Sequence, residues 1–300
     1  CTTAFQDEID RFRQTTADRA LVPYLVGLPR ASEEQTEQLL RLIGAMGDAA
    51  TIMNMPMLNL MAGVGANLSL ARGNTVLAPL MYTLLGQGLV AVLRAYQEAN
   101  ELVQAAAVLS GDSLRDLWSF GRTRVHQFWF VLHWSRHIAR SLPEIEADYA
   151  VTRRAHDPLY GGYMLSIGTI TRFFMGQSMP DVLRAHERVV DHCSPYPLDA
   201  VVAFTEPYAG AAAALAGRTG GLTDLDCRDF NLAQFTERNR NMPMVMGLLR
   251  GAQIPVLGLA GAYEDVLRLA EDPHLQVSPP FAPHVVVAFW RGVAAATLAR

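Results

Sequence analysis

Three histidines form the sharpest candidate for chemistry in this chain. His126, His133 and His137 lie in one aromatic-rich segment, and the last two are four residues apart, as in helical metal sites. If the segment is one continuous helix, a rotation of about 100° per residue puts all three on one face. Such a face could hold a metal ion or a haem. One hypothesis is therefore an all-α metal- or haem-dependent enzyme.

The same helical face also carries arginines, which changes its expected chemistry. Cations repel a metal ion, and no cysteine or carboxylate nearby in the sequence completes a ligand set. We therefore expect no catalytic residue, no metal ligand and no cofactor. The alternatives are a basic recognition stripe, or a solvated or inter-repeat face with no ligand. The candidate binding residues are Arg115, Arg122, His126, His133, His137 and Arg140.

The elements that must position these residues are predicted to be helices. Apolar helices break repeatedly at short turns, most clearly in residues 256–272 and 169–188, and successive turns lie roughly 40 residues apart. Prolines recur at expected helix starts, including Pro255, and glycines at helix ends. These patterns predict an all-α superhelical solenoid of antiparallel, tetratricopeptide-like helix hairpins.

Two helices of this prediction matter for the site. One is expected from residue 112 or 113 to about 138, with the histidines on its polar side. Another begins near Ser32 and has an apolar run over residues 39–43, which Met46, Ala50 and Met53 continue on one face. Residues 285–289 could form a strand, but the surrounding pattern favours a helix.

The predicted domain organisation has two parts. Residues 1–31 are more polar and less periodic, which suggests a linker or the end of a preceding repeat. Residues 32–300 are assigned to the solenoid. Because the chain starts at Cys1 and stops at Arg300 inside an apolar helical pattern, we expect both ends to be cuts in a longer polypeptide.

Composition limits the partners and the location. A net charge of −4 provides no global basic field for nucleic acid. Three cysteines without CxxC spacing favour a reducing compartment, so we predict a cytoplasmic protein. Two apolar stretches, 200–217 and 242–262, are interrupted by charged residues and prolines, which argues against membrane insertion.

Residues 39–74 carry a resemblance to a known family. Their sequence, LLRLIGAMGDAATIMNMPMLNLMAGVGANLSLARGN, resembles the helical region of large bacterial signalling proteins. In those proteins a serine/threonine kinase-like domain and an AAA- or STAND-type ATPase precede a tetratricopeptide-like region, and GAF and histidine-kinase modules follow. Later stretches, including 122–136 and the turn at 173–176, are similar and occur in the same order.

The resemblance implies a role between an ATP-driven switch and output modules. The chain would be a non-catalytic sensor or scaffold arm that binds a protein, a peptide or a small effector. Its partners would be the ATPase and kinase modules of the same polypeptide. An alternative is the solenoid arm of an ATPase-type transcriptional regulator, which shares the same layout.

Overall fold

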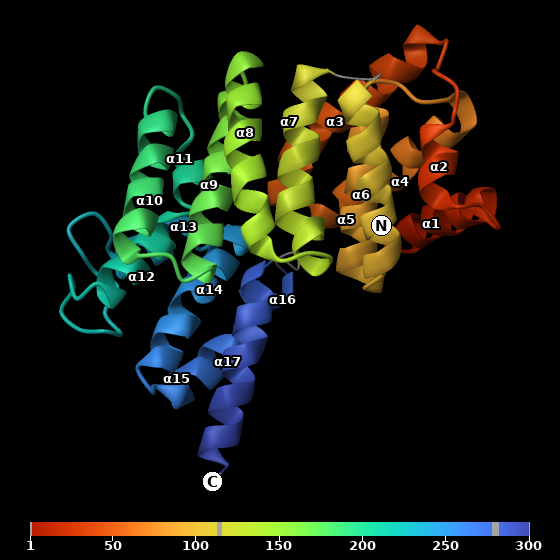
Figure 1. Ribbon diagram of the computed structural model, residues 1–300. Helices are drawn as coiled ribbons and strands as arrows, with labels where there is room; N and C mark the ends of the chain where they lie inside the picture. The colour runs from red at the N-terminus through yellow and green to blue at the C-terminus, as the bar shows by residue number, and fades with distance from the viewer. Residues whose placement is uncertain (1, 113–115, 278–281, 300) are drawn as a thin grey trace. The chain divides into compact units, whose positions relative to one another are not determined.

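The computed structural model describes residues 2–112, 116–277 and 282–299, and the described residues are all-α (Figure 1). They contain no strand, only two isolated bridges. The predicted fold class is confirmed at this level. The chain divides into two compact units, residues 1–137 with 154–157, and residues 138–153 with 158–300. The boundary expected after residue 31 stays a prediction.

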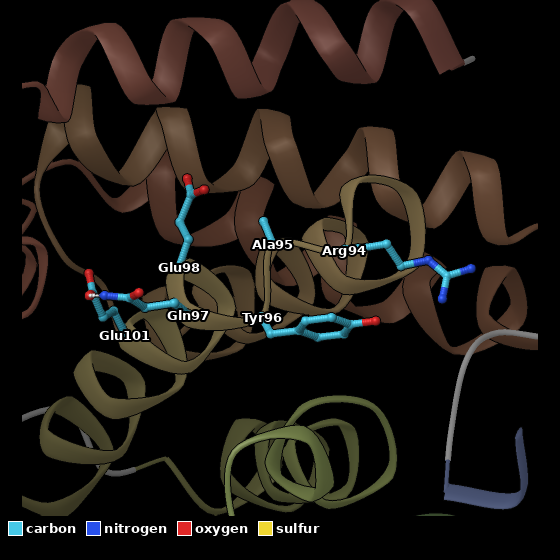
Figure 2. Close-up of a pocket in the computed structure, with 6 residues that line it drawn as sticks. All are labelled: Arg94, Ala95, Tyr96, Gln97, Glu98 and Glu101. Atoms are coloured by element: carbon cyan, nitrogen blue, oxygen red, sulfur yellow. Dashed lines mark hydrogen bonds between the residues drawn. The ribbon is translucent and has the colours of Figure 1, made fainter. Parts of the chain in front are cut away.

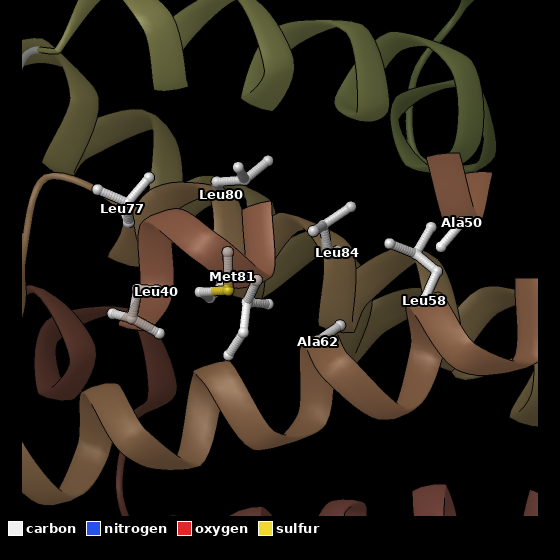
Figure 3. Close-up of a cluster of buried hydrophobic side chains, with 9 residues drawn as sticks. Leu40, Ala50, Leu58, Ala62, Leu77, Leu80, Met81 and Leu84 are labelled. Atoms are coloured by element: carbon white, nitrogen blue, oxygen red, sulfur yellow. The ribbon is translucent and has the colours of Figure 1, made fainter. Parts of the chain in front are cut away.

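The first unit contains seven α-helices among the described residues. They are α1 (Thr2–Thr16), α2 (Leu21–Val26), α3 (Glu34–Met53), α4 (Met55–Arg72), α5 (Ala78–Gly88), α6 (Tyr96–Asp112) and α7 (Leu117–His126). Helix α1 buries Phe5, Ile9 and Phe12, which recur at the helical period, and packs against α4. Helices α3, α4 and α5 share a core that includes Leu40, Leu58, Leu80, Met81 and Leu84 (Figure 3).

The turn after α4 ties the start of the chain to this core. Gly73 has φ 98°, and a side chain there would meet the Pro29 carbonyl oxygen. Asn74 is buried; its amide Nδ2 donates to the Leu25 carbonyl at 2.7 Å, and its Oδ1 accepts from the Tyr82 hydroxyl at 2.8 Å. Gly73 and Asn74, which end the stretch of residues 39–74, therefore hold α2 against the rest of the first unit.

The second unit contains α8 to α17 among the described residues. The helices are α8 (Ser141–Arg154), α9 (Pro158–Phe174), α10 (Met179–Cys193), α11 (Asp199–Val202), α12 (Glu206–Leu215), α13 (Leu232–Asn239), α14 (Pro243–Leu259), α15 (Tyr263–Ala270), α16 (Pro273–Val277) and α17 (Ala282–Leu298). Helix α9 packs against α10, α12 against α10 and α14, and α17 against α14 and α15.

Three helices of this unit end in the same way. After α9, α12 and α14 the chain passes through Gly176, Gly217 and Gly261, with φ of 66°, 69° and 75°. At each end the glycine N–H bonds to the carbonyl three residues back, and the next N–H bonds to the carbonyl five residues back. This is the Schellman arrangement. The glycines lie about 40 residues apart, the spacing of helical repeats.

Two local predictions differ from the structure, and one agrees. The single helix expected up to residue 138 is wrong, because α7 ends at His126 and a π-helix (Gln127–Val131) and a 3₁₀ turn (Leu132–Trp134) follow. Pro255 lies inside α14 rather than at a helix start. That helix is buried along almost its whole length, and this burial offsets the lost backbone hydrogen bond. Residues 285–289 are helical, as predicted.

Candidate functional site

The residues of the histidine–arginine face predicted from sequence differ widely in exposure. Arg122 and His126 are buried, His133 is half-buried, and His137 and Arg140 are exposed. Arg115 lies outside the described residues. The prediction assumed 3.6 residues per turn throughout, whereas the change to π and 3₁₀ geometry after residue 126 rotates the later side chains away from that register.

His126 lies in a buried hydrogen-bonded chain. Its Nδ1 donates to Gln87 Oε1 at 2.7 Å, and Gln87 Nε2 donates to the Met55 sulfur at 3.1 Å. Burial, with a smaller contribution from the nearby Arg122 charge, lowers the pKa of His126 to about 3. The imidazole is therefore neutral at physiological pH. It contributes no positive charge to a recognition stripe.

Arg122 is the centre of a buried ion-pair cluster. Its Nη2 donates to Asp48 Oδ2 of α3 at 2.8 Å, and its Nη1 donates to Asp157. The guanidinium also lies over the Trp118 ring, with Cζ 3.8 Å from the ring centroid. Two carboxylates and an aromatic ring thus enclose this side chain. It joins α3, α7 and residues 154–157 within the first unit.

His133 belongs to an aromatic contact chain. Its ring centroid lies 4.8 Å from that of Trp134, which in turn lies 5.0 Å from Tyr96.

Across the described part of the chain, no group of three or more histidine, cysteine or acidic side chains could hold a metal ion. In the same residues, no helix is both long and apolar enough to cross a bilayer.

The structure adds a surface depression of about 590 Å³ in the first unit (Figure 2). It lies where the π-helix Leu89–Leu93 gives way to α6, and Arg94 makes the turn with φ 57°. Glu98 accepts two hydrogen bonds from Arg13, at 2.7 and 3.2 Å, which fixes one wall. The residues that line it are Arg94, Ala95, Tyr96, Gln97, Glu98 and Glu101.

The outer face of α3 is a second feature that sequence reasoning missed. Leu39, Leu42 and Met46 follow one another at intervals of three and four residues, and they are 47%, 57% and 52% exposed. Met46 was expected to continue the buried face, but Leu40, Ile43 and Ala50 form that face. A contiguous row of large exposed apolar side chains is typical of a protein-interaction surface. We call these three residues the α3 outer face.

Comparisons with protein-family models, curated proteins and solved structures find no match to this chain. Its described residues combine a buried charge cluster that orders α3, an apolar surface on that helix and a polar depression beside α6.

Proposed function

We propose that this chain is a non-catalytic sensor or scaffold arm that binds a protein or peptide through the α3 outer face. The observation that carries this proposal is the half-exposed row of Leu39, Leu42 and Met46. Covering the exposed half of each side chain would contribute about 1 kcal/mol. Three such contacts on one helix suit a transient partner rather than a permanent one.

The geometry of α3 supports specific binding at this surface. The opposite side of the helix is packed in the core of the first unit, and Asp48 pairs with the buried Arg122. The backbone beneath the exposed side chains is thus held in place, which lowers the ordering cost of binding. Met46 has a flexible, polarisable side chain that adapts to different partner shapes.

We further propose that the hairpins stack as a tetratricopeptide-like superhelical solenoid and relay binding to ATPase or kinase modules. The three identical glycine-capped helix ends in the second unit support repeated hairpins. The ion pair between Asp48 and Arg122 supports a relay, because a partner that displaces α3 must also strain that pair. The resemblance of residues 39–74 to the helical region of large bacterial signalling proteins supports the choice of ATPase or kinase modules as partners.

Site-specific photocrosslinking tests the proposal. Leu42 is replaced by a photoreactive phenylalanine in the cell that makes the protein, and crosslinked peptides are identified by mass spectrometry. Glu187, exposed on α10, is the control position. We expect position 42, and not position 187, to capture a segment with an ATPase or kinase domain. Equal labelling at both positions would contradict the proposal. Capture beside a DNA-binding domain would instead favour the transcriptional-regulator arm.

The depression beside α6 supports a second candidate, a small polar effector. Arg94 provides a cation, Glu101 provides a carboxylate, and Tyr96 provides a ring surface. This mixed lining suits a zwitterionic molecule better than an apolar one. Chemical-shift perturbation with free amino acids as probes, compared between wild type and Arg94→Gln, checks this candidate. Unchanged α6 resonances at millimolar probe concentrations would reject it.

A further inference from the structure

Helix α17 is apolar on two opposite sides. One side packs against α14 and α15 and includes Val287, Trp290 and Ala294. Trp290 lies so close to Gly258 of α14 that even a methyl group at 258 would overlap its ring. A helix that is apolar all round is normally covered all round. The second apolar side of α17, however, is exposed.

The exposed side forms a regular stripe along the helix. Its seven residues follow one another at intervals of one or three. All are apolar or small, none is buried, and the last directly follows the end of the helix; they are Val285, Ala288, Phe289, Gly292, Ala295, Ala296 and Ala299. We call them the α17 stripe. At 100° per residue the stripe is centred opposite the packed side. Phe289 is 61% exposed and Val285 is 49% exposed.

The order of side-chain sizes along the stripe is complementary to its own reverse, so that large residues face small ones. The large residues, Val285 and Phe289, lie before Gly292, and alanines lie after it. When two copies of the stripe run antiparallel about Gly292, position 289 faces 295 and position 285 faces 299. Each large side chain then meets a small one, and Gly292 meets Gly292, where added atoms would find open space. This is the self-complementarity of a two-fold contact.

We propose that the α17 stripe binds the α17 stripe of a second copy of this chain, as an antiparallel helix pair centred on Gly292. The contact extends the layer in which α12, α14 and α17 already pack in order. It is about 22 Å long, from 15 residues at 1.5 Å each. Because one helix offers less than a standard interface, we expect a reversible, concentration-dependent dimer. This inference is independent of the proposed function.

Sedimentation equilibrium over a range of concentrations tests the dimer. Phe289→Glu and Ala296→Glu place charges on the stripe and should weaken dimerisation at least about tenfold. Arg291→Glu is the matched control, since it is exposed on the same helix but lies off the stripe, and it should dimerise like wild type. Circular dichroism verifies that each variant is folded. A wild-type chain that stays monomeric at several hundred micromolar would overturn the proposal and assign the stripe to a different protein or to a later segment of the longer polypeptide that the sequence predicts.

Disulfide trapping in a cysteine-free background tests the register. Gly292→Cys should form a covalent dimer under mild oxidation, because the two positions face each other. A mixture of Val285→Cys and Ala299→Cys chains should form the mixed dimer, while Val285→Cys alone should not. Crosslinking of Val285→Cys to itself would show a parallel pair and overturn the antiparallel arrangement. Arg291→Cys, which lies off the stripe, provides the background level of disulfide crosslinking.

Discussion

Arg122 on α7 and Asp48 on α3 are 74 residues apart in the chain, yet Arg122 Nη2 donates to Asp48 Oδ2 at 2.8 Å. Asp157 and the Trp118 ring also contact the guanidinium. A residue that the sequence placed on a recognition stripe is therefore part of the internal framework of the first unit. The predicted binding role of the exposed His137 and Arg140 stays a prediction.

Removing this arginine should strongly destabilise the first unit. Arg122→Met leaves Asp48 and Asp157 without their shared cation, and breaking a buried pair costs about 3–5 kcal/mol. Urea unfolding followed by tryptophan fluorescence measures the loss, since Trp118, Trp129 and Trp134 all lie in this unit. Arg72→Met removes an exposed pair with Glu33 and should cost less than about 1 kcal/mol. Equal losses for both variants would contradict the buried-cluster interpretation.

Acid should destabilise the first unit through His126. Its pKa is about 3 when folded, against an ordinary value of 6.5, so below pH 6.5 the unfolded chain binds a proton that the folded chain does not. Stability should therefore fall as pH drops from about 6.5 towards 3, by up to about 1.4 kcal/mol per unit. Urea midpoints measured between pH 5 and 8 check the slope.

A substitution at position 126 isolates this contribution. His126→Met cannot titrate, so its stability should change less between pH 5 and 8 than that of wild type, even though it loses the hydrogen bond to Gln87. The exposed, non-titrating Thr15→Ala serves as the control, because it leaves His126 in place, and it should retain the wild-type slope. A His126→Met slope as steep as wild type would show that another group causes the acid sensitivity.

Two glycines, one packed between α14 and α17 and one on the exposed side of α17, should respond in opposite directions to alanine. At Gly258 a new Cβ would lie 2.2 Å from the Trp290 ring, so Gly258→Ala must displace α17 and should cost about 1–3 kcal/mol. At Gly292 the added methyl meets no atom within 4 Å, and alanine favours the helix by up to about 1 kcal/mol. Thermal unfolding at low protein concentration measures both. Stabilisation by Gly258→Ala would contradict the close packing of Trp290 on α14.

The stability cost of replacing the glycines that cap α9 and α14 should depend on backbone conformation alone. Gly176 and Gly261 have positive φ, and a side chain at either position has open space around it. Alanine at either position should cost about 1 kcal/mol, because the left-handed conformation strains L-residues. Asparagine tolerates that conformation better and should cost less. Paired urea titrations of the alanine and asparagine variants test this order, and equal costs would argue against a positive φ.

Helix content and many helix ends could be predicted because they depend on nearby residues. The turns at Gly176 and Gly261, and the helix at residues 285–289, were all predicted correctly. Predictions that used the helical wheel to choose a buried or exposed side did less well. Met46 was assigned to the core and is exposed, whereas Arg122 was assigned to a polar face and is buried.

The sequence by itself therefore determined the all-α class and the glycine-capped hairpin turns, since hydrophobic period, proline and glycine act within a few residues. Tertiary structure alone decided that His126 is neutral and that Arg122 pairs with Asp48 and Asp157. It also decided which sides of α3 and α17 stay uncovered. The physical reason is that desolvation, ion pairing and exposure depend on residues brought together from distant parts of the chain. Those contacts produce no periodic pattern of residue types in the local sequence.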